Sequence, residues 1–136
     1  MSTAPDPFTG SWTFVPGESH WPEPPPRSWL QDITCSAERI RVVERIESAT
    51  GEHTSHSVDA SFDGREYPVA GSAQVETIAY TRPERSRIDG VGRKAGRVVF
   101  SEVIAVAPER GRLTQTIVFA RAGGEPVQGI AVFQRA

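Results

Sequence analysis

The stretch Ile40–Phe62, "IRVVERIESATGEHTSHSVDASF", decides the fold, because it places two alternating runs of residues around a short turn. Alternate residues of a β-strand share one face. Glu44 stands on the more apolar face of the first run, and His56 stands on the more apolar face of the second. The stretch therefore predicts a β-hairpin that directs a carboxylate and an imidazole toward the core.

The turn sets the register of this hairpin. If Ala49–Gly51 is a three-residue turn with its glycine in the left-handed conformation, Glu44 lies directly opposite His56. Opposed side chains have Cβ atoms about 4.5–5.5 Å apart, so we expect these two to be in contact. Such a pair either orders a polar patch as a satisfied ion pair or transfers protons as an acid and a base. The pattern leaves both interpretations open.

The rest of the chain repeats this pattern of short runs and turns. No window of helical length shows a sustained apolar period of 3.6 residues. The loop 16–27 is different, because five of its twelve residues are proline, and we expect it to be an extended cover outside the ladder. Strands are predicted at Phe8–Val15, Trp29–Ser36, Arg39–Ser48, His53–Phe62, Glu66–Ala70, Gln74–Thr81, Arg87–Arg93, Arg97–Ala107, Arg112–Ala122 and Val127–Arg135.

These strands, joined mostly by tight hairpins, predict an all-β fold, an up-and-down antiparallel β-barrel of about 8–10 strands with a central cavity. Closure removes the unpaired edges of an open sheet. A β-sandwich is the alternative, and it requires long connections between sheets. The length of 136 residues predicts a single domain spanning 1–136, with a flexible N-terminus at 1–7.

Composition and charge argue against several classes of protein. The formal charge of −2, with arginines interleaved among acids as in "RPERSRID", argues against nucleic-acid binding. Cys35 is the only cysteine, which excludes an intrachain disulfide and a cysteine-based zinc site, and we expect a buried, inert thiol. His53 and His56 point to opposite faces of one strand, so we expect no metal site. The segment "GVGRKAG" lacks phosphate-loop spacing, and no cofactor is expected.

The N-terminal sequence "MSTAPDPFTGSW" shows neither a basic segment nor an apolar run, so no signal peptide is visible. No stretch approaches the roughly 20 apolar residues needed to cross a bilayer. We therefore expect a cytoplasmic protein without a membrane span. The sequence leaves its oligomeric state open.

Four segments resemble the bacterial lipocalin-like domain family: "DPFTGSWTFVPGESHWPEPPPRSW", "FDGREYPVAGS", "VETIAYTR" and "GEPVQGIAVFQR". They cover nearly the whole chain in order, and the "DG-x-x-YPV-x-G" element is the most specific of them. The resemblance implies a calycin-type barrel whose cavity holds a small hydrophobic molecule. It also implies that Trp12 closes the barrel floor beneath a basic residue of a late strand, either Arg121 or Arg135. Many members are secreted, and this chain departs from them in showing no export signal.

Strand alternation nominates further inward side chains beyond the first hairpin. Glu102 shares an apolar face with Phe100 and Ile104, and Gln115 lies among apolar neighbours. Glu76 shares a face with Ile78 and Tyr80. His20 and Trp21, in the proline-rich loop, form either a lid over the barrel mouth or an exposed surface.

These residues support three hypotheses. The first is a barrel that binds a small, largely hydrophobic ligand. The second is a cofactor-independent isomerase, cyclase or hydratase with His56 as base, Glu44 as its orienter, and Glu102 or Tyr80 as a second proton donor. The third is a structural or interaction module whose barrel is filled by side chains. In the first, contact area comes from Phe62, Ile78, Tyr80, Phe100, Ile117 and Phe119, and hydrogen bonds come from Glu44, His56, Glu102 and Gln115.

Overall fold

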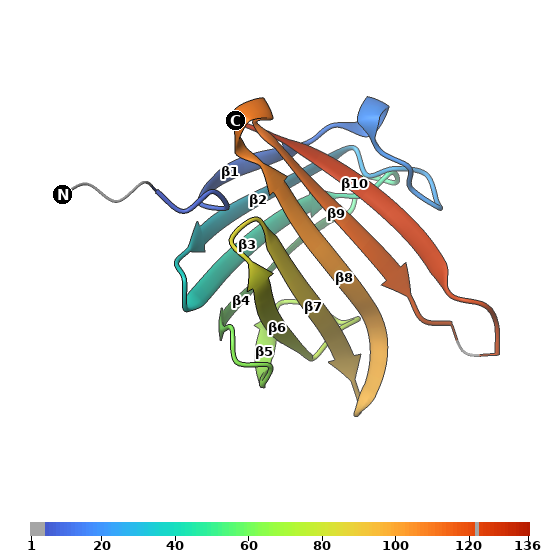
Figure 1. The fold of residues 1–136 in the computed structure, drawn as a ribbon. Helices are drawn as coiled ribbons and strands as arrows, with labels where there is room; N and C mark the ends of the chain where they lie inside the picture. Colours follow the sequence, from blue (N-terminus) through green and yellow to red (C-terminus); the bar gives the residue numbers. More distant parts are fainter. Residues whose placement is uncertain (1–4, 122) are drawn as a thin grey trace.

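Ten antiparallel strands close into a barrel in the computed structural model, which describes residues 5–121 and 123–136 (Figure 1). Two short 3-10 helices, η1 (Pro16–Glu18) and η2 (Pro108–Arg110), lie between strands. The strands are β1 (Gly10–Phe14), β2 (Ser28–Cys35), β3 (Arg39–Glu47), β4 (His53–Ser61), β5 (Glu66–Ala70), β6 (Thr77–Glu84), β7 (Arg87–Lys94), β8 (Arg97–Ala107), β9 (Arg112–Phe119) and β10 (Val127–Arg135).

Each strand pairs with the next along the chain, and β1 pairs with β10 to close the cylinder. The predicted fold class, an all-β up-and-down antiparallel barrel, is confirmed. The sandwich alternative is excluded because one continuous ring of strands replaces two facing sheets. Within the described residues, no helix is long and apolar enough to cross a membrane.

The first hairpin, β3–β4, has the predicted register, with Glu44 opposite His56. Gly51 adopts φ +90° in the turn, which is the left-handed conformation that the turn requires. Arg41 and Arg45 are exposed on the outer face of β3. The hairpin therefore presents its inner face to the barrel interior as the alternation predicts.

Several strand boundaries differ from the prediction by one to three residues. β6 was expected at Gln74–Thr81 but begins at Thr77, because the hydroxyl of Ser72 accepts the backbone N–H groups of Gln74 and Val75 and holds a turn there. β1 begins at Gly10, because the N–H of Phe8 donates to the Asp6 carboxylate. β9 ends at Phe119, and the predicted strand end at Ala122 lies outside the described residues.

The closed end of the barrel is built around Trp12. Its side chain is fully buried, and its Nε1–H donates to the carbonyl of Phe8 at 2.9 Å. The guanidinium of Arg135 lies 4.3 Å from the centroid of the Trp12 ring and donates to the Thr9 and Pro7 carbonyls. Arg135, not Arg121, is therefore the basic residue over the tryptophan. This arrangement is compatible with a calycin-like fold.

Gly10 is required for this close approach. Its φ is +146°, and a Cβ at this position would collide with Nη1 of Arg135. Gly10→Ala is expected to lower the free energy of unfolding by about 1–3 kcal/mol, since it adds backbone strain and displaces the guanidinium. Urea denaturation measures the loss. Gly17→Ala is the control, because a Cβ at Gly17 meets nothing within 4 Å. Equal stability of the two variants would contradict the proposed role of Gly10.

The N-terminal segment was predicted to be flexible over 1–7, and residues 1–4 lie outside the described residues. Asp6, however, forms an ion pair with Arg82 at 2.7 Å, with side chains 8% and 7% exposed, respectively. The segment is anchored there because Arg82 supplies a buried positive charge. Sequence patterning did not reveal this partner.

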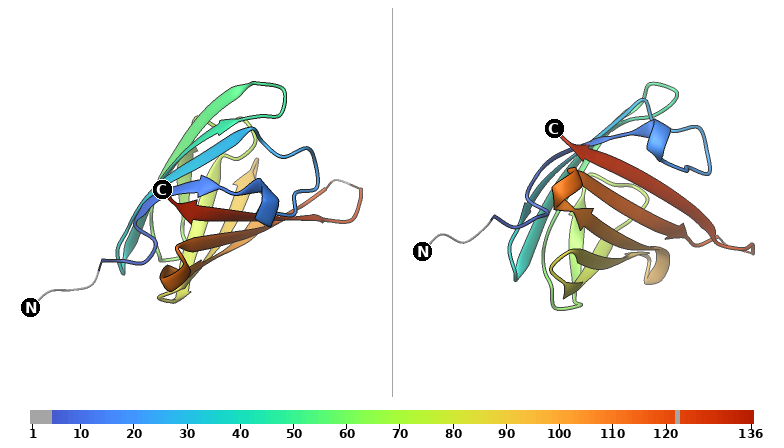
Figure 2. Two further views of the ribbon diagram at one scale, coloured as in Figure 1. Left: turned by 90° about the horizontal axis from the view of Figure 1, so that it is seen from above. Right: turned by 45° about the horizontal axis from the view of Figure 1, so that its top comes forward.

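The proline-rich loop runs beside β10 (Figure 2). The prediction that it stays outside the ladder is wrong at His20, whose N–H and C=O each form a 2.8 Å hydrogen bond with the backbone of Ile130. His20 is free to pair because it is not a proline and retains its backbone donor. The bridge holds the loop at the end of the barrel opposite Trp12.

Candidate functional site

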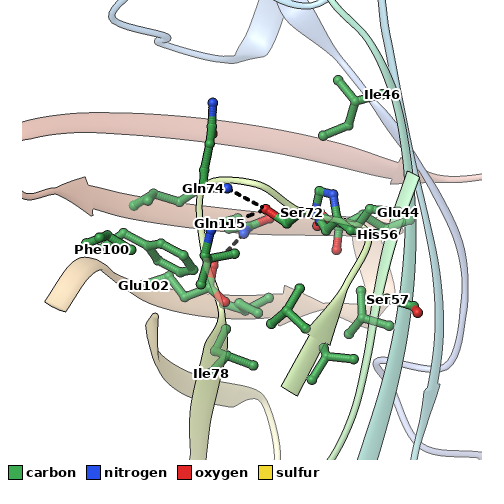
Figure 3. Close-up of a pocket in the computed structure, with 18 of the residues that line it drawn as sticks. Glu44, Ile46, His56, Ser57, Ser72, Gln74, Ile78, Phe100, Glu102 and Gln115 are labelled. Carbon is green, nitrogen blue, oxygen red and sulfur yellow. Dashed lines mark hydrogen bonds and ion pairs between the residues drawn. The ribbon is translucent and has the colours of Figure 1, made fainter. Parts of the chain in front are cut away.

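A cavity of about 270 Å³ lies inside the barrel, between the closed end and the proline-rich loop. Figure 3 shows the polar residues that line it, with Glu44 and His56 on one side and Glu102 and Gln115 on the other. The apolar lining includes Trp21, Trp29, Val42, Ile46, Val58, Ile78, Tyr80, Phe100, Ile104, Ile117 and Phe119.

The structure brings nearly all of the sequence-nominated residues to this cavity. Its lining includes Glu44, His56, Ile78, Tyr80, Phe100, Glu102, Gln115, Ile117 and Phe119. Phe62 does not line the cavity, because it packs near the Arg82 guanidinium at the closed end. A strand rises about 3.3 Å per residue, so Phe62 lies roughly 20 Å along the chain from His56. Glu76 is exposed, and its carboxylate accepts the N–H of Ala95.

Glu44 and His56 form the first polar group of the cavity wall. Oε2 of Glu44 contacts Nε2 of His56, and Oε1 of Glu44 accepts the indole N–H of Trp29 at 3.0 Å. The hydrogen bond that His56 donates to the Glu44 carboxylate raises the pKa of His56 above its usual 6.5; burial opposes this shift, and the charges of Glu44 and Glu102 add to it. The imidazolium form is therefore favoured more strongly than in an exposed histidine.

The coupling of this pair is testable by NMR titration. Glu44→Gln is expected to lower the pKa of His56, because burial then acts without the compensating carboxylate. Glu47→Gln is the matched control, since Glu47 lies on the same strand and pairs with Arg27 outside the barrel. An unchanged His56 titration in Glu44→Gln would show that the two groups are not coupled.

Glu102, Gln115 and Gln31 form the second polar group. Gln115 Nε2 donates to Glu102 Oε2 at 2.6 Å, and Gln31 Nε2 donates to Gln115 Oε1 at 2.8 Å. Burial raises the pKa of Glu102 to about 7; the hydrogen bond from Gln115 and the charge of His56 oppose this shift, and the charge of Glu44 adds to it. Glu102 therefore changes its charge near neutral pH.

Two glycines of β7 make room for this group. A Cβ at Gly90 would lie 3.0 Å from both Oε1 of Glu102 and Cε1 of Tyr80. The carboxylate and the phenol ring therefore lie near each other, in space that a side chain at Gly90 would occupy. A Cβ at Gly92 would overlap the ring of Phe100. Small residues at these inward positions let larger neighbours pack flat against the wall.

Tyr80 contributes a hydroxyl to the cavity. Burial raises its pKa well above 10, and the charges of Glu102 and Glu44 add to this shift, so the phenol stays protonated. Among the described residues, no protein group forms a hydrogen bond with this hydroxyl, and Tyr80 lines the cavity. It is therefore available as a donor to a molecule in the cavity.

Trp21 closes part of the cavity mouth. Its ring makes edge contacts with Trp29 at 5.3 Å and with Phe119 at 5.9 Å between centroids. It also lies against Gly129, where a Cβ would approach the indole to 2.9 Å. Of the two interpretations of this loop, the lid applies to Trp21, whereas His20 is exposed.

Trp29 and Gln31 were not nominated from the sequence, although both line the cavity; Trp29 donates to Glu44, and Gln31 donates to Gln115. The signal was present: Trp29, Gln31 and Ile33 alternate on one face of the predicted second strand. The same alternation that identified Glu44 would have identified Gln31.

In residues 5–121 and 123–136, no group of three His, Cys, Asp or Glu side chains could hold a metal ion. Cys35 is a buried free thiol beside Arg82, and burial raises its pKa to about 12, so it is a poor nucleophile.

Comparison of the chain with protein-family models, curated proteins and solved structures gave no significant match. The resemblance to lipocalin-like domains therefore remains a prediction at the level of the family. What the cavity does must be inferred from its own geometry.

Proposed function

We propose that the protein binds a small, largely hydrophobic molecule inside the barrel. The observation that carries this proposal is the cavity of about 270 Å³ with mostly apolar walls and two polar groups. Pockets for small molecules typically combine apolar contact area with a few placed hydrogen-bonding groups. The cavity volume favours a binder over a barrel filled by its own side chains.

The polar groups are suited to orienting a ligand. Tyr80 and Glu102 both line the cavity, and among the described residues no protein group forms a hydrogen bond with the Tyr80 hydroxyl or with Oε1 of Glu102. A ligand that buries a polar atom without pairing it loses about 1–3 kcal/mol, so a ligand that pairs with these two atoms is favoured and takes a fixed orientation.

Filling the cavity tests the proposal. Ile117→Trp places an indole in the cavity, because Ile117 is 6% exposed and lines it. We expect binding of the fluorescent apolar probe N-phenyl-1-naphthylamine to fall at least about tenfold, which corresponds to about 1.4 kcal/mol. Val118→Trp is the matched control, since the adjacent residue faces outward and is 36% exposed. Unchanged probe binding in Ile117→Trp would place the probe outside the barrel and contradict the proposal.

Native mass spectrometry of freshly purified protein is the experiment that identifies a ligand. We expect an added mass that is lost on unfolding and is reduced in Ile117→Trp. Retention of the same mass by the Ile117→Trp variant would argue against binding in the cavity.

Proton transfer in the same cavity is the second candidate function, and the Glu44–His56 contact favours it. The raised pKa of His56 suits it to donate a proton, rather than to act as the base first expected, while Glu102 titrates near neutral pH. A cofactor-independent isomerase or hydratase would use these groups. Incubating the co-purified compound with the protein in D₂O tests this: wild type is expected to introduce deuterium at carbon, and His56→Gln is not. Absence of exchange with wild type would contradict proton transfer and leave ligand binding as the proposed function.

A further inference from the structure

The cavity wall carries more acidic than basic side chains. Its lining includes two carboxylates, Glu44 and Glu102, and one histidine, His56. Among the described lining residues there is no lysine and no arginine. Glu44 is occupied by His56 and by the indole of Trp29, so the one available positive charge is already paired.

Glu102 is the carboxylate without a cation. Its side chain is 6% exposed, and Oε2 accepts a hydrogen bond from the neutral amide of Gln115. Oε1 has no partner among the described residues and lies beside the ring edge of Tyr80, over Gly90. An ionised carboxylate buried in this way is stable only when a positive charge joins it.

Two aromatic side chains line the cavity near Glu102. Phe100 lies two residues before Glu102 on β8 (Figure 3), and its ring packs on Gly92. The ring of Tyr80 lies near Glu102 at Gly90, and both rings line the cavity. The face of an aromatic ring attracts a cation within about 6 Å of its centroid, and the attraction strengthens when water is excluded.

We propose that the cavity selects a hydrophobic amine in its protonated form, with the ammonium group on Glu102 and the hydrocarbon part against the apolar walls. This inference rests on the proposed binding function and specifies its ligand class. A ligand carboxylate would instead meet two acidic side chains and only one histidine, which is already paired, so fatty acids and other apolar anions are disfavoured.

Three probes of nearly equal size separate these cases: 1-naphthylmethylamine, 1-naphthylmethanol and 1-naphthoate. Isothermal titration with the wild-type protein is expected to show the amine binding about tenfold tighter than the alcohol, and the naphthoate at least about tenfold weaker than the alcohol. The groups facing Glu102 are Tyr80, Gln115, Glu44 and His56. Because Glu102 ionises near pH 7, affinity for the amine is expected to rise between about pH 6 and about pH 8, while affinity for the alcohol stays nearly constant.

Glu102→Gln is the decisive variant. It keeps a hydrogen-bonding amide beside Gln115 and removes the charge, so the preference for amine over alcohol is expected to disappear while the alcohol still binds. Glu52→Gln is the matched control, because it removes one exposed carboxylate from the β3–β4 turn and is expected to retain the preference.

These experiments distinguish a failure of the amine inference from a failure of the proposed ligand binding. Equal binding of amine and alcohol by wild type, or an amine preference that persists in Glu102→Gln, overturns the amine inference and leaves ligand binding intact. Absence of binding by all three probes and by N-phenyl-1-naphthylamine overturns both.

Discussion

Replacing Arg82 with methionine is expected to lower the free energy of unfolding by about 3–5 kcal/mol. The guanidinium pairs with Asp6 through two hydrogen bonds, of 2.7 and 3.1 Å. Both side chains are buried, at 7% and 8% exposure. Methionine preserves much of the hydrocarbon volume but leaves the Asp6 carboxylate buried without its cation. Burial of this unpaired charge accounts for most of the expected loss in stability.

Arg82 also joins several segments at the closed end. It donates to the Ser36 carbonyl at 2.8 Å and to the Arg85 carbonyl at 2.6 Å. Its guanidinium lies 5.2 Å from the ring centroid of Phe8 and 5.6 Å from that of Phe62. Loss of this side chain therefore loosens the floor of the barrel as well as the ion pair.

A double-mutant cycle separates the charge effect from the packing effect. The variant Asp6→Leu/Arg82→Met leaves neither charge buried, so it is expected to recover much of the loss. Arg39→Met is the surface control, because both members of the Arg39–Asp59 pair are exposed and little change is expected. Urea denaturation measures wild type, Asp6→Leu, Arg82→Met, the double variant and the Arg39→Met control. A double variant no more stable than Arg82→Met would show that contacts of the guanidinium other than those with Asp6 dominate.

The pH dependence of this pair provides an independent check. Burial opposes ionisation of Asp6, but hydrogen bonds from Arg82 and the Phe8 N–H, with the charge of Arg82, lower the net pKa below 3.8. A depressed carboxyl pKa stabilises the fold above the unfolded value and is lost as the pH falls through the folded value. The difference between wild type and Arg82→Met is therefore expected to shrink in acid.

The sequence predicts well what is decided locally. Strand alternation and the glycine turn are enough to place Glu44 opposite His56, because a hairpin of fixed loop length has one register. All ten strands of the described structure overlap predicted ones for the same reason. Local signals also nominated most of the cavity wall, since inward residues of successive strands must line one lumen.

Contacts between distant segments are what the sequence does not predict. Asp6 and Arg82 are 76 positions apart, and no periodicity links them. Gln31 and Gln115 are 84 positions apart and meet only because the closed ring brings β2 across from β9. Phe62 was nominated only because it shares the inward face of its predicted strand with His56. Alternation does not reveal how far along the barrel axis a residue lies.

Stability is expected to fall as the pH rises through about 7, and Glu102→Gln is expected to remove most of that fall. Burial raises the pKa of Glu102 from 4.5 to about 7. Between these values the folded state binds a proton that the unfolded state has released, so the free energy of unfolding decreases with increasing pH. This difference between the folded and unfolded pKa of Glu102 lowers the free energy of unfolding by roughly 3 kcal/mol by about pH 9.

His56 contributes in the same direction. Its folded pKa is raised, so its stabilising effect is complete below the unfolded value of 6.5 and is lost as the pH rises through the folded value. Glu102→Gln should therefore keep a small residual slope, and Glu44→Gln/Glu102→Gln should flatten it further. The contributions of Glu102 and His56 to the pH dependence are separable because each is removed by a different substitution.

Urea denaturation between about pH 5 and about pH 9 measures the effect. Near pH 5 Glu102 is protonated, and glutamine accepts the same hydrogen bond from Gln115, so wild type and Glu102→Gln should be almost equally stable. Near pH 9 the variant should be more stable by roughly 3 kcal/mol, whereas Glu109→Gln, on exposed η2, should follow wild type. Parallel curves for wild type and Glu102→Gln would mean that the carboxylate is hydrated when ionised. The cavity would then not be the dry, uncompensated environment on which selection of an amine depends.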